Sequence, residues 1–370
     1  MIEKKVTWLE LFFDLIFVVA IASTNHWLLN IEEEQSLEIL FKYFLMVIPL
    51  WWAWTGQTMF YNRFDKYLKV PIIFMGLQIL AIVIMCASFN LDFDKTYFTF
   101  ILGYALSRLV TIIEYIITYK RNDDSNNSIV SKTLASCLSV GLLITLLSLF
   151  IPSPLRYVIM YLGIFLDLIL PLIYHSKLKL VPVHIGHLAE RLGLLVMISF
   201  GEAIVSVVSF IENNSFSFNN ICFLLAMLLA LILLFLSYYS EYDDIINKRH
   251  QGSGQLLLYS HLFIISSIML IACLIHIGFF INESLLLYLI GFVALVCFIF
   301  FKNIIFEYYD YLKEKIAFKR IFILIIVIIG LGIFGLIFKE HYFVYYIILI
   351  VITSIIDIIV LKNSRVNKKD

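Results

Sequence analysis

The sequence predicts an all-α integral membrane protein with about twelve transmembrane helices. Hydrophobic residues make up 62% of the 370 residues, and the mean hydropathy is +0.97. Asp, Glu, Lys and Arg together supply only 15%, which is too little to cover the surface of a soluble domain of this size. Apolar runs approach the roughly 20 residues that a helix needs to cross the hydrocarbon core. The formal net charge of zero offers no basic field, so we expect no nucleic-acid partner.

These apolar runs define the predicted spans. In chain order they are residues 8–24, 38–60, 71–90, 96–119, 132–151, 155–175, 188–211, 217–240, 255–277, 284–305, 319–338 and 342–361. The first run contains Asp14 and lacks a small-residue cleavage site, so we interpret it as a retained helix and not as a signal peptide. Tryptophans favour the membrane interface, which is where we expect Trp8, Trp27, Trp51, Trp52 and Trp54.

Basic residues indicate the orientation. The loops that follow odd-numbered spans carry almost no Lys or Arg, and the first of them contains Glu32, Glu33 and Glu34. The positive-inside rule then predicts that both termini are cytoplasmic. The heavy use of Ile, Phe, Lys and Asn indicates an AT-rich bacterial genome, and hence a bacterial cytoplasmic membrane. The basic residues assigned to the cytoplasmic side are Lys4, Lys5, Arg63, Lys66, Lys69, Lys120, Arg121, Lys132, Lys177, Lys179, Lys248, Arg249, Lys302, Lys313, Lys315, Lys319, Arg320, Lys362, Arg365, Lys368 and Lys369.

Short sequence words recur between the two halves of the chain. Residues 165–169 read FLDLI in the sixth predicted span, and residues 355–359 read IIDII in the twelfth. This recurrence predicts two parallel six-helix repeats, residues 1–180 and 181–370, related by an axis along the membrane normal. The five cysteines lie in apolar runs without CxxC spacing, which favours buried thiols over metal ligands or disulfides.

Ionisable residues within apolar spans are costly, so each is a candidate site. In the first span, Glu10 and Asp14 lie one turn apart on one helical face. Two neighbouring carboxylates repel when both are ionised, so we expect either that one of them is protonated or that the two share a cation. The alternative is that Glu10 reaches cytoplasmic water and Asp14 pairs with an arginine of another helix.

The seventh span carries the second group of polar residues: His187, Glu190, Arg191 and Glu202. Glu202 falls near the predicted middle of the membrane, beside Gly201, where a glycine would admit a neighbouring backbone. We expect Glu202 to carry a proton. The alternative is a protonated Glu202 that only hydrogen-bonds between helices.

The remaining candidates lie in four other spans. Arg108 and Glu114 belong to a polar stripe on the fourth span, and His261 in the ninth could titrate near neutral pH. Pairing Arg108 or Arg191 with acidic residues is the cheapest arrangement at low dielectric, and structural pairing and substrate binding both remain open. The acidic residues available for pairing are Asp14, Asp167, Glu190, Glu202 and Asp357.

Two segments carry a family resemblance: ELFFDLIFVVAI at residues 10–21 and HLAERLGLLVMISFGEAIV at residues 187–205. They resemble the bacterial low temperature requirement protein A family, as do NRFD at residues 62–65 and the layout of the whole chain. Phe200 and Ala203 stand where leucine and serine are expected. The family name records growth in the cold, so the resemblance implies the membrane class and leaves the activity open. The residues it emphasises are Glu10, Phe13, Asp14, His187, Glu190, Arg191, Gly201 and Glu202.

Paired repeats with interior carboxylates and arginines favour a proton- or cation-coupled secondary transporter of a small solute, surrounded by membrane lipids. We expect Glu202 to carry the proton, Glu10 and Asp14 to form a relay, and Arg108 and Arg191 to hold an anionic substrate or tune the carboxylates. No GxxxxGK[ST] motif is present, so ATP-driven transport by this chain and a bound cofactor are not expected.

Two alternatives remain. The first is an intramembrane enzyme acting on a lipid or lipid-linked substrate, with a divalent ion or general acid–base chemistry at Glu10, Asp14, Asp65 and Glu190. The second is a channel or membrane sensor, although no filter-like sequence is visible.

Overall fold

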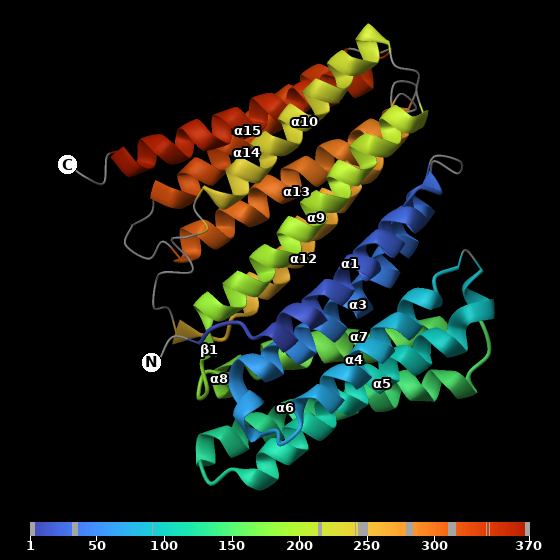
Figure 1. Ribbon diagram of the computed structural model, residues 1–370, viewed down its shortest axis with the longest axis vertical. Coiled ribbons are helices and arrows are strands. Elements are labelled where there is room, and N and C mark those ends of the chain that lie inside the picture. The colour runs from blue at the N-terminus through green and yellow to red at the C-terminus, as the bar shows by residue number, and fades with distance from the viewer. Residues whose placement is uncertain are drawn as a thin grey trace. The chain divides into compact units, whose positions relative to one another are not determined.

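The computed structural model describes residues 4–31, 36–90, 92–213, 217–240, 242, 251–278, 284–309, 316–337, 339 and 341–366. The long helices are α1 (Trp8–Leu28), α3 (Leu37–Phe64), α4 (Pro71–Ala87), α5 (Phe93–Arg121), α6 (Ser125–Leu147), α7 (Leu155–Ile173), α9 (Ile185–Asn213), α10 (Phe218–Tyr239), α12 (Gln255–Ile277), α13 (Leu285–Tyr309), α14 (Ile316–Gly335) and α15 (Tyr342–Val366). The shorter elements are η1 (Asp65–Tyr67), η2 (Ser148–Phe150), α8 (His175–Leu178), β1 (Val183–His184) and β2 (Gln251–Gly252). Figure 1 shows their order along the chain.

Each predicted span coincides with one long helix. Ten of the described helices are long and apolar enough to cross a membrane, and the apolar helices Pro71–Ala87 and Ile321–Gly335 are shorter. The chain is therefore an all-α membrane protein. The count of twelve spans and the cytoplasmic location of both termini stay predictions.

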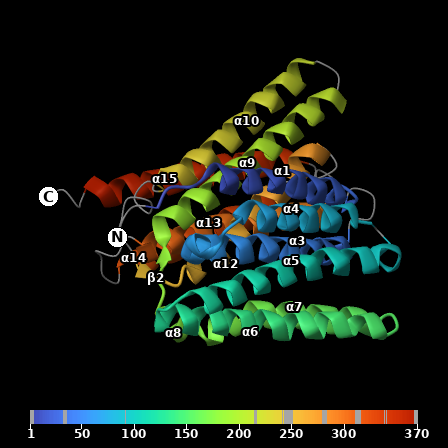
Figure 2. The same cartoon turned by 60° about the horizontal axis from the view of Figure 1, so that its bottom comes forward.

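The chain forms two compact units that are discontinuous in sequence. Unit 1 comprises Met1–Trp27, Lys42–Arg191 and Arg249–Leu258, and unit 2 comprises Leu28–Phe41, Leu192–Lys248 and Tyr259–Asp370. Within unit 1, α4, α5, α6 and α7 pack in sequence order, and Figures 1 and 2 show α5, α6 and α7 side by side. Within unit 2, α10 packs on α15, and α13, α14 and α15 pack on one another. The predicted repeats 1–180 and 181–370 stay a prediction.

Glycines bring α6 and α7 into backbone contact. A Cβ at Gly141 would lie 2.0 Å from Oδ1 of Asp167, and one at Gly163 would lie 2.6 Å from the Gly141 carbonyl oxygen. Helices pack this closely in membranes where small residues face one another. The approach places the Asp167 carboxylate directly over the α6 backbone.

A two-stranded antiparallel pair is the element that the sequence did not predict. β1 pairs with β2 through Val183 opposite Gly252 and His184 opposite Gln251. Pro182 precedes β1, and the residue before a proline favours extended backbone. Just after β2, Gly254 has φ 71°, a conformation that favours glycine. The pair lies within unit 1 and fixes the chain that leads into α9.

Two expectations about positions along the helices are wrong. Trp51, Trp52 and Trp54 lie midway along α3 with exposures of 5%, 6% and 0%, and so are not at a helix end. Lys302 does not lie in a loop, because α13 continues to Tyr309 and the Lys302 side chain is fully buried. For Trp54 and Lys302, an interior carboxylate partner outweighs the usual preference for the interface. Glu32–Glu34, Lys248, Arg249, Lys313, Lys315, Lys368 and Lys369 lie outside the described residues.

Candidate functional site

The candidate site begins at the first turn of α1, where Thr7 and Glu10 form a capping box. The Glu10 backbone N–H donates to Oγ1 of Thr7 at 3.3 Å, and the Thr7 backbone N–H donates to Oε2 of Glu10 at 3.0 Å. The Thr7 hydroxyl also donates to that oxygen, at 2.9 Å. A threonine followed three residues later by a glutamate satisfies two free N–H groups at a helix start in this way. Local sequence therefore fixes the Glu10 carboxylate in place.

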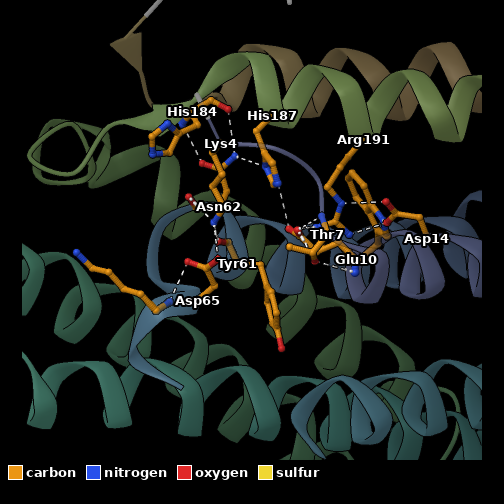
Figure 3. Close-up of polar contacts among 12 residues, drawn as sticks. Lys4, Thr7, Glu10, Asp14, Tyr61, Asn62, Asp65, His184, His187 and Arg191 are labelled. Atoms are coloured by element: carbon orange, nitrogen blue, oxygen red, sulfur yellow. Dashed lines mark hydrogen bonds and ion pairs between the residues drawn. The ribbon is translucent and has the colours of Figure 1, made fainter. Parts of the chain in front are cut away.

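Arg191 of α9 joins both acidic residues of α1. Its Nε and Nη2 donate to the two Asp14 oxygens at 2.9 and 2.6 Å, a bidentate pair. Its Nη1 lies 3.4 Å from Oε1 of Glu10, and Figure 3 shows the guanidinium facing both carboxylates. Trp54 of α3 donates its indole N–H to Oδ1 of Asp14 at 2.7 Å, and its ring centroid lies 5.5 Å from the Arg191 guanidinium carbon. The two carboxylates therefore share a cation, which is Arg191.

His187 stands beside Glu10, and Asn62 determines where its proton lies. The Asn62 Oδ1 accepts the His184 backbone N–H at 2.9 Å, and its Nδ2 donates to the His184 carbonyl oxygen at 3.1 Å. These two bonds orient the amide, so the same Nδ2 group meets Nδ1 of His187, 3.0 Å away, as a donor. Nδ1 must accept, which places the ring proton on Nε2. Nε2 lies 3.2 Å from Oε1 of Glu10.

The cluster is buried and carries an excess of negative charge. Exposure is 0% for Glu10 and Arg191, 2% for Asp14 and 3% for His187. The alternative expectation, that Glu10 reaches cytoplasmic water, is therefore wrong. Every group that contacts the two carboxylates is a donor, which is the environment of the ionised form. Two carboxylates, one guanidinium and a neutral imidazole sum to one negative charge. A single bound proton or cation would bring the cluster to neutrality.

An ion pair and two hydrogen bonds from side chains to backbone carbonyl oxygens hold the chain around this cluster. Lys4 forms an ion pair with Asp65 at 3.0 Å and donates to the Tyr61 carbonyl oxygen, which ties the segment before α1 to the end of α3. Arg63 donates from Nε to the Val181 carbonyl oxygen at 3.0 Å. Burial lowers the pKa of His184 below its usual 6.5, and the nearby Lys4 charge lowers it further.

Other predicted site residues lie outside the cluster. Arg108 is 3.7 Å from Asp167, and Glu114 instead accepts from Gln57 at 3.0 Å. Glu190 is on the exposed face of α9. Glu202 is half-buried in unit 2. A Cβ at Gly201 would meet nothing within 4 Å, so this glycine does not admit a neighbouring backbone as predicted.

Asp357 belongs to a separate buried cluster in unit 2. Lys302 of α13 forms an ion pair with Oδ2 of Asp357, and the Ser237 hydroxyl donates to the same oxygen at 2.6 Å. Asn303 donates to Oδ1 at 3.0 Å. Also in unit 2, His261 lies 2.6 Å from the Tyr238 hydroxyl, measured at Nε2.

Sequence reasoning missed six residues of these clusters: Thr7, Trp54, Asn62, Ser237, Lys302 and Asn303. The T-x-x-E spacing identifies Thr7 as a cap, and NRFD contains Asn62 within the family resemblance. Trp54 and Lys302 carry no signal of their own, because the sequence does not show which helix each one faces. Among the described residues, no three His, Cys, Asp or Glu side chains are grouped so that they could hold a metal ion. The divalent-ion grouping of the enzyme alternative is therefore not formed there.

The apolar helices and the buried ion-pair clusters define a multi-pass α-helical membrane protein. The family model for the bacterial low temperature requirement A protein matches residues 5–358, and the chain belongs to this family. The chain is also similar to the uncharacterized protein RA0937 of Rhizobium meliloti (strain 1021), at 23% identity over 213 residues. That match covers 55% of this chain and 51% of the relative, so the chain spans about half the length of the curated relative it matches. No solved structure matches the chain.

Proposed function

We propose that this protein is a secondary transporter of a small solute, coupled to protons through His187 and Glu10. The observation that carries the proposal is the buried cluster in which Glu10 and Asp14 share Arg191, leaving one negative charge uncompensated. Uncompensated charge is costly at low dielectric, and a proton is the smallest species that removes it. His187 is the one group of the cluster whose unperturbed side chain titrates near neutral pH.

Proton uptake by His187 would be linked to movement of α9. A proton on Nδ1 would face Nδ2 of Asn62, a second donor, across the 3.0 Å contact. Turning the Asn62 amide to relieve this clash would break both of its bonds to the His184 backbone. Protonation therefore works against the contact between α3 and the start of α9, while the doubly protonated ring gains attraction to Glu10. A transporter needs such a link between proton binding and helix packing.

The test is proton entry into proteoliposomes that contain the full-length protein and an internal pH-sensitive dye. With the outside made acidic, wild-type protein is expected to admit protons when small carboxylates, amino acids or sugars are added in turn, and the active solute identifies the substrate class. His187→Gln is expected to lower solute-dependent proton entry at least tenfold, since glutamine takes up no proton. His175→Gln, at an exposed site on α8, is the matched control and should behave as wild type.

Glu202→Gln tests the competing assignment of the proton to the middle of α9. If it abolishes solute-dependent proton entry while His187→Gln leaves it unchanged, the proton carrier is Glu202 and not His187. If no solute in the panel produces proton entry in the wild type, proton-coupled transport of these solute classes is rejected.

A further inference from the structure

Arg108 is a buried cation whose three side-chain nitrogens make no hydrogen bond of normal geometry to the described residues. It lies midway along α5 and has an exposure of 0%. Among the described residues, its Nε, Nη1 and Nη2 atoms all lack a hydrogen-bond partner. A guanidinium carries five N–H donors, and buried polar groups are almost always paired. The unpaired N–H donors of this guanidinium are therefore a candidate anion-binding group.

Asp167 does not satisfy this guanidinium. The Asp167 Oδ2 atom lies 3.7 Å from Nε of Arg108, beyond hydrogen-bonding distance, and accepts the Tyr104 hydroxyl at 2.6 Å. The other oxygen lies over Gly141 of α6. Asp167 is thus held from two sides by Tyr104 and α6, and it supplies partial charge balance without occupying the donors of Arg108.

The guanidinium of Arg108 lies against the α3 backbone at Gly56. A Cβ at Gly56 would lie 2.8 Å from Nη1 of Arg108 and 3.7 Å from Oγ1 of Thr111. That threonine hydroxyl already donates to the Ser107 carbonyl oxygen and accepts from Gln78. The Tyr104 ring lies 5.0 Å from the guanidinium carbon. Glycine at position 56 therefore permits the guanidinium to lie against α3, and the neighbouring hydroxyl is already engaged.

We propose that Arg108 binds a small oxyanion, specifically the carboxylate of a water-soluble solute, in a site bounded by Gly56, Tyr104 and Asp167. A planar guanidinium can donate two parallel N–H bonds, and this geometry matches the two oxygens of a carboxylate. Because Arg108 has no exposed surface, the proposed binding requires the surrounding helices to separate to admit the solute. The statement that this carboxylate is the transported solute rests on the function proposed above. The binding of a carboxylate to Arg108 is tested without any proton gradient.

The experiment uses full-length protein in detergent, with thermal unfolding followed by tryptophan fluorescence. Formate, acetate and lactate are titrated as sodium salts, and sodium chloride at equal ionic strength serves as the reference. The wild type is expected to show a saturable rise in unfolding temperature with at least one carboxylate. Arg108→Lys should weaken the apparent affinity about tenfold or more, because an ammonium keeps the charge but cannot donate two parallel N–H bonds.

Two variants keep the proposal falsifiable should the Arg108 variant fold poorly. Gly56→Ala displaces the guanidinium without changing any charge and should also weaken binding about tenfold, whereas Gly76→Ala, where a Cβ meets nothing within 4 Å, is the matched control. Asp167→Asn removes the competing negative charge and should tighten binding severalfold.

The contrary outcomes are distinct. A carboxylate effect equal to that of chloride in the wild type and in Asp167→Asn means that Arg108 holds only water, and it overturns the proposal. An effect retained in Gly56→Ala places the anion elsewhere and also overturns it. Stabilisation by phosphatidylglycerol micelles without any by carboxylates would assign the site to a lipid headgroup instead of a solute. Carboxylate binding without solute-dependent proton entry would retain this site and reject the proton coupling proposed above.

Discussion

Two buried ion pairs, one in each compact unit, differ in how completely they are satisfied. In unit 2, Nζ of Lys302 donates to the Ser237 carbonyl oxygen at 3.2 Å and contacts the Ser237 hydroxyl oxygen at 2.9 Å, in addition to its ion pair with Asp357. Both Asp357 oxygens accept hydrogen bonds. In unit 1, Arg108 makes no hydrogen bond among the described residues. The first pair has the features of a structural contact, and the second is the pair proposed above to bind an anion.

The positions of the two pairs follow the proposed repeat. Arg108 and Asp167 come from the fourth and sixth predicted spans, and Lys302 and Asp357 come from the tenth and twelfth. A cation on one helix paired with an aspartate two spans later is what duplication of a six-helix unit would produce. At these corresponding positions, Lys302 has three bonded partner atoms, whereas Arg108 has an ion pair at 3.7 Å and no hydrogen bond among the described residues.

Lys302→Met is expected to give the largest effect. Removing one partner of a buried pair leaves the other charge uncompensated, which costs about 3–5 kcal/mol in the free energy of unfolding. Denaturant unfolding in detergent micelles would measure this loss. The double variant Lys302→Met with Asp357→Leu should recover most of it, because replacing both charges with apolar groups is often neutral. A single variant as stable as wild type would contradict the structural role.

Gly141→Ala tests how Asp167 is held in place. The new Cβ would lie 2.0 Å from Oδ1 of Asp167 and 2.8 Å from the Gly163 carbonyl oxygen, a backbone atom that cannot move alone. Overpacking of this kind costs about 3 kcal/mol, at the upper end of the usual range. Gly201→Ala is the control, since its Cβ meets nothing within 4 Å. Equal unfolding free energies for the two variants would mean that α6 and α7 are not in backbone contact.

Arg108→Met is expected to cost less than Lys302→Met. It removes an ion contact of 3.7 Å but no hydrogen bond, and Asp167 keeps its bond from Tyr104. The expected loss is about 3 kcal/mol, the lower end of the range for a broken buried pair, because the guanidinium takes no hydrogen bond with it. The same unfolding measurement applies. A loss as large as that of Lys302→Met would show that Arg108 is structural, and the comparison between the two pairs would fail.

Helix positions could be predicted from the sequence much better than the contacts between helices. Each predicted span coincides with an observed helix, because the length and hydropathy of an apolar run are properties of the local sequence. The spacing of Glu10 and Asp14 correctly put both carboxylates on one face of α1, and a buried charge required a partner such as Arg191. What could not be predicted is the set of partners from other helices. Trp54 was expected at the interface and Lys302 in a loop, because tryptophan and lysine usually occur there and only tertiary contacts override that preference.

The ion pair between Arg191 and Asp14 joins residues 177 positions apart. At a synthesis rate of about 5–20 residues per second, the ribosome produces α1 about 10–35 s before it produces Arg191. During that interval the first helix carries two acidic side chains without their cation, and bare carboxylates insert poorly into hydrocarbon. Because α9 is synthesised after α1, the insertion of α1 into the bilayer is complete only once α9 has supplied Arg191. Truncated chains ending before Arg191 should hold their first helix less firmly in the bilayer than the full chain does.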